Sequence, residues 1–248
     1  MLRAGGEGSH SVLWTTQALR SEPQERTLSK LPLPPPRRLP WPLKPLSSAH
    51  TSLEYDRFGR MVMRIEHELV RGLSPDMVAW WFRNIEGEVE IDGRRLDRYL
   101  AWHPYDHIRW ELRNRLPGGV GVGSRFRIVE AFGADPRNYI DIVDTVTRLD
   151  ETGITLVNRD FGVEITRLSH DFTAVPGGTL YRSTLIVGTS VPMLRRVLNP
   201  LLHRVAFTEE MGRAWLKHNV EEVGLLEHLV PLLRQMLERP APATGPGV

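Results

Sequence analysis

A histidine and a glutamate four positions apart, His218 and Glu222, are well placed in this sequence for chemistry. They lie within residues 208–237, where apolar residues recur at spacings of three and four, the pattern of a helix with one buried face. Both side chains fall on that face, where an unpaired carboxylate would cost roughly several kcal/mol. A divalent metal would compensate it, because side chains on successive turns can reach one ion. A partly exposed His–Glu pair on the helix is the alternative.

A second inward-pointing carboxylate is predicted at Glu130. Residues 124–132 alternate between apolar and polar positions, which is typical of a strand with one buried face. Glu130 falls in the same row as Phe126, Ile128 and Phe132 rather than on the arginine-bearing side. Such a carboxylate is either paired internally or binds a cation.

Three more histidines lie where they could join this group. His103 and His107 are separated by Pro104, so they cannot share a helical face, and we interpret their segment as a loop leading into a strand over residues 107–114. His170 shares a predicted strand face with apolar neighbours and therefore points inward. It is either a core histidine or a pocket residue.

The residue types restrict the metals that such a site could bind. The chain has no cysteine, so thiolate ligands and disulfides are excluded. A set made of Glu130, His218, Glu222 and either His107 or His103 suits Zn²⁺ better than Mn²⁺ or Fe²⁺. Because Asn219 follows His218, the H-E-x-x-H pattern of zinc peptidases is absent.

The elements that must position these residues indicate an α+β protein. A helix is predicted from Pro75, after the cap residue Ser74, and residues 83–106 are expected to be irregular around a turn at Asp92. A long C-terminal helix against a curved antiparallel sheet would enclose a cavity, with His218 and Glu222 facing into it. Strands are expected at residues 61–70, 107–114, 124–132, 139–146, 154–159, 163–174 and 179–188, and helices at residues 192–205 and 208–237.

Composition divides the chain into an arm, a domain and a tail. Residues 1–50 are rich in proline and glycine and are expected to be disordered, residues 51–238 form the domain, and residues 239–248 form a disordered tail. The arm has seven Lys or Arg and three acidic residues, a balance of +4, so the rest of a chain with net charge +2 carries −2. Charge therefore gives no reason to expect nucleic-acid binding. No apolar run is long enough for a membrane span, and a cytoplasmic location is the default expectation.

Four segments of the chain resemble the family of diacetylphloroglucinol hydrolase and phloretin hydrolase. They are residues 75–82, residues 99–107 with the pattern W-x-P-x-D-H, Val129 with Glu130, and residues 218–222 with the pattern H-x-x-E-E. The resemblance covers roughly residues 60–237. It implies a Bet v1-like helix-grip domain and a zinc ion held by two histidines and two glutamates. Matched motif to motif, the ligands are His107, Glu130, His218 and Glu222.

The resemblance also implies substrate-contacting residues. Tyr99 matches a tyrosine that holds the substrate, and His170 and Tyr181 match more loosely as residues facing an acylated phenol. Trp110 departs from the family pattern, since it stands where a substrate-contacting asparagine is expected.

The function expected from these patterns is a zinc-dependent hydrolase that cleaves a carbon–carbon bond of an acylated phenol or 1,3-diketone in retro-Claisen fashion. Zn²⁺ would polarise the acyl carbonyl and activate water, and His170 or a tyrosine would hold ring oxygens or shuttle a proton. A metal-free helix-grip carrier and a metal-free polyketide cyclase, each binding an apolar aromatic ligand, are the alternatives. The expected partner is a small aromatic or diketone molecule, and a homodimer is left open.

Overall fold

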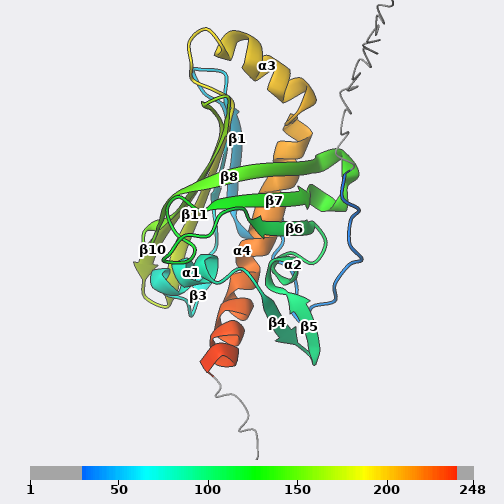
Figure 1. Ribbon diagram of the computed structural model, residues 1–248, viewed down its shortest axis with the longest axis vertical. Helices are drawn as coiled ribbons and strands as arrows, with labels where there is room; N and C mark the ends of the chain where they lie inside the picture. Colours follow the sequence, from blue (N-terminus) through cyan, green and yellow to red (C-terminus); the bar gives the residue numbers. More distant parts are fainter. Residues whose placement is uncertain (1–29, 239–248) are drawn as a thin grey trace, which may run out of the picture. The chain divides into compact units, whose positions relative to one another are not determined.

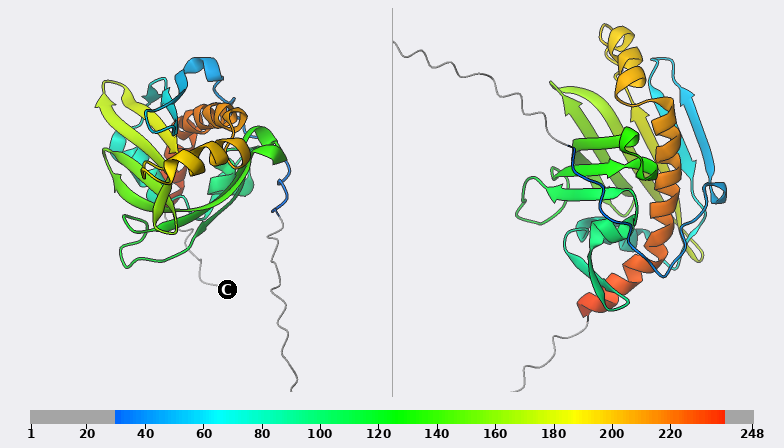
Figure 2. Two further views of the ribbon diagram at one scale, coloured as in Figure 1. Left: turned by 90° about the horizontal axis from the view of Figure 1, so that it is seen from above. Right: turned by 90° about the vertical axis from the view of Figure 1, so that its right-hand side faces the viewer.

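The computed structural model describes residues 30–238, of which Leu31 onwards belongs to one compact unit. Predictions for residues 1–29 and for the tail at 239–248 lie outside the described residues. The unit is built on a nine-stranded sheet in which every neighbouring pair is antiparallel and the order is β1-β2-β11-β10-β9-β8-β7-β6, with β3 beside β11. Figures 1 and 2 show the sheet curling around one long helix.

The strands of this sheet include two long central ones, β8 and β10, which form hairpins with their neighbours. Alternation along them places apolar side chains on the concave face. The strands are β1 (His50–Tyr55), β2 (Met61–Glu66), β3 (Val70–Arg71), β6 (His107–Leu112), β7 (Arg125–Ala131), β8 (Tyr139–Asp150), β9 (Gly153–Asp160), β10 (Val163–Val175) and β11 (Gly178–Val187). A separate hairpin pairs β4 (Glu88–Ile91) with β5 (Arg94–Asp97).

Helix α4 (Glu209–Glu238) lies across the concave face and supplies much of the core. It buries side chains around most of its circumference, from Met211 to Leu233, because the sheet covers one side and α1 (Pro75–Arg83) and α2 (Arg98–Trp102) contact it elsewhere. The remaining α-helix, α3 (Arg195–Val205), directly precedes α4 in the chain. No helix within residues 30–238 is long and apolar enough to cross a membrane.

Two hydrophobic clusters fill the space between sheet and helices. One gathers Trp81, Phe82 and Trp102 around the C-terminal half of α4, and the other gathers Met61 and Met63 around its N-terminal half. Burying aromatic side chains of this size contributes several kcal/mol each, on the order of 3. The α+β helix-grip architecture predicted from the sequence, a curved antiparallel sheet wrapped around a long C-terminal helix, is confirmed.

Two predictions about the chain's course are wrong. Residues 30–50 were assigned to the arm, yet Arg37 donates to the carbonyls of His103 and His107 (3.1 and 3.0 Å) and β1 begins at His50. Proline removes backbone donors but leaves side chains such as Arg37 free to dock on the domain. Residues 83–106, expected to be irregular, contain β4, β5 and α2, whose short lengths give almost no periodic signal.

Gly178 provides a test of the sheet's packing. A Cβ atom there would lie 2.1 Å from the carbonyl oxygen of Val70 in the paired strand β3, and backbone cannot move as a flexible side chain does. We expect Gly178→Ala to lower the free energy of unfolding by about 1–3 kcal/mol. Thermal unfolding followed by circular dichroism measures this. Gly118→Ala is the control, because nothing lies within 4 Å of a Cβ at Gly118; equal stability of the two variants would contradict the prediction.

Candidate functional site

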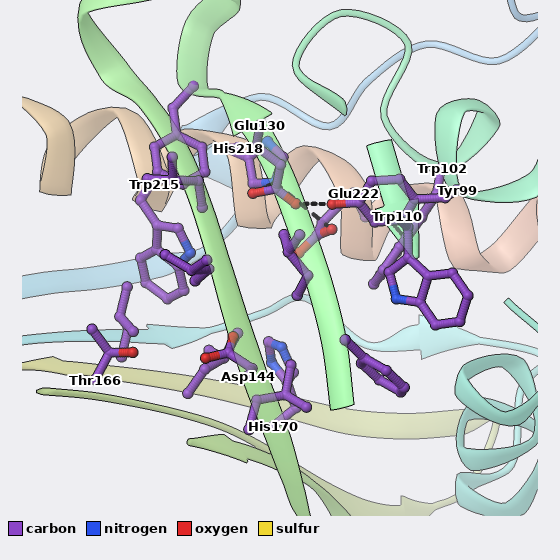
Figure 3. A pocket seen from close by; sticks show the side chains of 18 of the residues that line it. Tyr99, Trp102, Trp110, Glu130, Asp144, Thr166, His170, Trp215, His218 and Glu222 are labelled. Atoms are coloured by element: carbon purple, nitrogen blue, oxygen red, sulfur yellow. Dashed lines mark hydrogen bonds and ion pairs between the residues drawn. The ribbon is translucent and has the colours of Figure 1, made fainter. Parts of the chain in front are cut away.

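Two imidazoles and two carboxylates from three elements converge inside the sheet. His107 Nε2 lies 3.4 Å from Glu130 Oε1 and 3.5 Å from Glu222 Oε2. His218 Nε2 lies 3.6 Å from Glu130 Oε2 and 3.8 Å from Glu222 Oε2. Each residue is at most 8% exposed. In Figure 3 the carboxylates of Glu130 and Glu222 point towards the same space as His218.

Strand register and helical periodicity together create this convergence. His107 opens β6 directly opposite Glu130 on β7, so both side chains leave the sheet on the same face. His218 and Glu222 occupy successive turns of α4, which crosses that face. The four side chains therefore meet only if the helix and the sheet pack as they do here.

The hydrogen bonds of His107 fix which ring nitrogen faces the site. Its Nδ1 lies 2.6 Å from the carbonyl oxygen of Tyr99 and donates to it, so Nε2 carries the lone pair. The phenol ring of Tyr99 stacks on the imidazole, with centroids 3.9 Å apart. Burial lowers the pKa of His107 to about 4, which keeps the ring neutral. His107 Nε2 has no hydrogen-bond partner within residues 30–238.

Asp106 orients His218 in the same way. His218 Nδ1 lies 3.0 Å from Asp106 Oδ2, and the backbone N–H groups of Gly133 and Ala134 donate to the same carboxylate at 2.9 Å. Burial opposes a charged His218, but the charge of Glu130 and the hydrogen bond to Asp106 outweigh it and raise its pKa to about 9. Burial works against ionised Asp106 too, yet its bond to His218 holds the pKa of Asp106 well below its usual range. Carboxylates that orient histidines in this manner are common around protein-bound metals.

Each glutamate of the site is held by a neighbouring donor. The hydroxyl of Tyr99 donates to Glu130 Oε1, and the amide of Asn219 donates to Glu222 Oε1. Burial raises the pKa of Glu222, against the opposing charges of His218 and His103. Oxygens of both glutamates remain directed at the two imidazoles.

His103 does not face the two glutamates. Its Nδ1 accepts the backbone N–H of Asp106 at 3.1 Å, and its Nε2 donates to Glu221 Oε2 at 3.3 Å. The side chains of His103, Asp106 and His218 also lie close enough together to be considered as metal ligands. The two hydrogen bonds of His103, however, already use both of its ring nitrogens. Of the two histidines that the residue pattern left open, His107 is the one directed at Glu130 and Glu222.

A largely apolar cavity extends into the core from Glu130, His218 and Glu222, whereas His107 is not among its lining residues. The space open to the centres of water molecules is about 120 Å³. His170 lines it, and its Nδ1 contacts Ser183 Oγ at 2.9 Å. Tyr181 is buried beside His170 and is not among the residues that line the cavity, so its contact with a ligand stays a prediction. Side chains from both hydrophobic clusters complete the lining, among them Phe82, Tyr99, Trp102, Trp110, Phe126, Phe132 and Trp215.

Sequence reasoning missed three polar residues around the site. Asp106 and Asn219 lie next to predicted ligands in the sequence, but only the packing of η2 (Phe132–Ala134) and α4 shows what they contact. Asp144 lines the cavity from β8 and is 3% exposed. Its alternation with Ile140 and Ile142 is the same signal that identified Glu130.

The residues present fit a divalent cation. A tetrahedral ion with bonds of about 2.1 Å to N and O ligands has ligand–ligand separations of roughly 3.4 Å. The four N···O separations observed, 3.4–3.8 Å, are close to that length; His107 pairs with Oε1 of Glu130 and His218 with its Oε2. His107, Glu130 and His218 form a group whose ligand atoms all lie within 4.8 Å of one another. His107 Nε2 is buried and has no hydrogen-bond partner among the described residues, as expected of an atom that binds a cation.

Fold and site together define a helix-grip α+β protein with a buried group of two histidines and two glutamates at one end of an apolar cavity. No model of a known protein family matches the chain, and no curated protein sequence matches it.

Solved structures resemble the chain only distantly. Protein Ms6760 from Mycobacterium smegmatis aligns at 10% identity and a TM-score of 0.42, over 72% of this chain and 96% of its own. The di-domain ARO/CYC StfQ from the steffimycin biosynthetic pathway aligns at 14% and 0.36, over 65% of this chain and 51% of its own. Ara h 8.0201 aligns at 12% and 0.34, over 65% and 98%. Likeness at this level carries no argument about activity.

Several buried or half-buried histidines make the stability of the protein sensitive to acid. Burial lowers the pKa of His67 and His170 to about 3, and that of His103 and His107 to about 4. In the unfolded chain these groups take up protons near pH 6.5, so acidification favours unfolding between pH 6.5 and about 4. Each histidine contributes up to about 1.4 kcal/mol per pH unit.

We therefore expect the free energy of unfolding, measured with urea in the presence of EDTA, to fall from pH 6.5 to 4.5. The raised pKa values of Asp144, Glu222 and His218 act in the opposite direction, but the four histidines with lowered pKa values outweigh these three groups. His170→Gln should reduce the slope of the free energy of unfolding against pH by up to the equivalent of one proton taken up on unfolding. A free energy that rises over this range, or an unchanged slope in the variant, would contradict the interpretation.

Proposed function

We propose that this protein is a zinc-dependent hydrolase that cleaves the carbon–carbon bond between an acyl group and a phenol ring or 1,3-diketone carbon. The proposal combines a candidate cation group of His107, Glu130 and His218, with Glu222 near both histidines, and an apolar cavity that receives a small aromatic or diketone molecule. The homodimer and the cytoplasmic location stay predictions.

The observation that supports a cation most strongly is the position of His107 Nε2. This nitrogen is unprotonated because Nδ1 donates to the Tyr99 carbonyl, yet it faces carboxylate oxygens of Glu130 and Glu222 at 3.4 and 3.5 Å. All three groups are hydrogen-bond acceptors, so without a proton or cation between them their lone pairs repel one another in a low-dielectric interior. One cation would turn all three contacts into attractions.

A metal-free function is the second candidate, and His218 is the observation that favours it. With a pKa raised to about 9 by Glu130 and Asp106 against the effect of burial, His218 can carry a proton at neutral pH. Charged His218 would then pair with Glu130 and Glu222, as in a structural ion-pair network. The cavity would in that case serve a carrier of apolar molecules or a polyketide cyclase. This network still leaves His107 Nε2 without a donor.

A divalent metal bound here would supply Lewis acidity, which polarises a carbonyl group and stabilises the negative charge that develops on its oxygen. The residues of the chain supply the remainder. Tyr99, whose pKa is raised well above its usual value by burial and by Glu130, keeps its proton and holds that carboxylate in place. The aromatic lining displaces water from the ligand and strengthens electrostatic interactions.

His170 has a narrower part in this proposal than the sequence suggested. Burial lowers its pKa to about 3, so at neutral pH it is a neutral hydrogen-bonding group rather than a proton shuttle. It therefore suits a role in holding a ligand oxygen. The net reaction consumes one water molecule, whose hydroxyl joins the acyl carbon while its other proton joins the ring or diketone carbon that is released.

Neighbouring glutamates on α4 allow a matched test. Glu222 faces His107 and His218, whereas Glu221 pairs with His103 and Lys217. We expect the purified protein to contain about one equivalent of zinc per chain, Glu222→Ala to lose it, and Glu221→Ala to retain it. Elemental analysis of the three proteins, with circular dichroism to confirm folding, measures this.

Hydrolysis is tested on the same three proteins. A panel of acylphloroglucinols and 1,3-diketones should yield a free carboxylic acid with the wild type and with Glu221→Ala, and the rate should fall at least about 100-fold with Glu222→Ala. Folded Glu222→Ala with full zinc content and full activity would refute the proposal. Wild type that binds these compounds but neither contains zinc nor releases acid would support the carrier or cyclase.

A further inference from the structure

Asp144 is a buried carboxyl group that the proposed reaction does not use. It projects from β8 into the cavity, is 3% exposed, and makes no hydrogen bond or ion pair with any residue between 30 and 238. In Figure 3 it lies across the pocket from Glu130 and Glu222. Leaving such a group unsatisfied costs roughly 1–3 kcal/mol, so its presence calls for an explanation beyond packing.

Strand register places Asp144 at a distance from the His–Glu group. Asp144 pairs with Phe126 on β7, while Glu130 pairs with Ile140 on β8. The two acids are thus four residues apart along the sheet, about 13 Å at the usual rise of a strand. Ile140, Ile142 and Asp144 all line the cavity, so they share its face of the sheet. The cavity therefore has two polar ends with an apolar stretch between them.

The surroundings of Asp144 select the kind of group that could satisfy it. Burial, followed by the charge of Glu130, raises its pKa to about 7, and no cationic group lowers it. A carboxyl group that readily takes up a proton can both donate and accept a hydrogen bond, which matches a hydroxyl group. Its strand partner Phe126 packs against Trp110, with ring centroids 5.0 Å apart, and both rings line the cavity. These flat, apolar walls favour a planar ring.

We propose that Asp144 binds a hydroxyl group on the ring of an aromatic ligand, at the end of the cavity away from His107 and Glu222. The orientation of the ligand's carbonyl towards the His–Glu group rests on the proposed function, but the hydroxyl contact itself does not. Asp144 would then determine specificity, because a ring that lacks the hydroxyl leaves the buried carboxyl unpaired. The resulting preference is expected to be about 10–100-fold in affinity.

The test compares three probes that differ in one substituent. They are para-hydroxyacetophenone, para-methylacetophenone and para-aminomethylacetophenone, which offer a hydroxyl, an apolar group of similar size and a cation. Affinities are measured by calorimetry on EDTA-treated full-length protein, so that the result does not depend on a metal. Wild type should bind the hydroxy compound about 10–100-fold more tightly than the methyl compound.

Variants assign the preference to one side chain. Asp144→Leu should abolish or reverse it and, by removing an unsatisfied buried polar group, should not lower the melting temperature. Asp144→Asn, which keeps a donor and an acceptor, should retain part of it. Asp141→Asn is the control on the same strand, because Asp141 is exposed and pairs with Arg127 outside the cavity. It should keep the full preference.

The outcomes separate this inference from the proposed hydrolase. A hydroxyl preference that survives in folded Asp144→Leu overturns the inference, even if the wild type contains zinc and hydrolyses its substrates. Tighter binding of the aminomethyl compound overturns it as well, since Asp144 would then bind a cation. A preference that disappears with Asp144→Leu supports the inference even if no zinc is found and no acid is released. If Asp144→Leu does not fold, an unchanged preference in Asp144→Asn, equal to that of Asp141→Asn, overturns it.

Discussion

The electrostatic cost of burying two carboxylates beside two imidazoles is the constraint on which this site depends. Glu130 and Glu222 lie in an interior where charges interact far more strongly than in water, so they require donors or cations around them. The fold supplies a phenol to one and an amide to the other. It also fixes both histidines through Nδ1, which turns their Nε2 atoms towards the carboxylates. Preorganisation of this kind limits the structural change that a bound cation would require.

One short segment carries much of this organisation. Within residues 99–107, Tyr99 binds Glu130, Asp106 binds His218, and His107 faces both glutamates. Trp102 donates its indole N–H to the backbone carbonyl of Glu222 at 2.8 Å, which ties the segment to α4. Because these contacts join the sheet to the helix, the segment couples the closure of the fold to the geometry of the site.

Periodicity allowed the sequence to predict what depends on one element alone. The buried face of α4 and the inward row of β7 follow from spacings of about 3.6 and 2 residues, and they located His218, Glu222 and Glu130. Contacts between elements leave no such trace. The residue pattern alone could not choose between His103 and His107, because that choice depends on packing. The same holds for the bond from Asp106 to His218 and for the position of Tyr181 outside the cavity. The inward position of Asp144 could have been predicted from the sequence, since its row alternates as clearly as that of Glu130.

A cavity with polar groups at both ends differs physically from one that only carries apolar molecules. A carrier gains affinity from burying nonpolar surface, and an unpaired carboxyl such as Asp144 weakens such a ligand's binding by the cost of keeping the group desolvated. A ligand with a carbonyl at one end and a hydroxyl at the other recovers that cost and is also held in one orientation. Orientation has little value for transport, but it brings a scissile bond to a fixed set of groups. The disposition of the polar residues therefore supports the proposal that the cavity binds an aromatic ligand in one orientation.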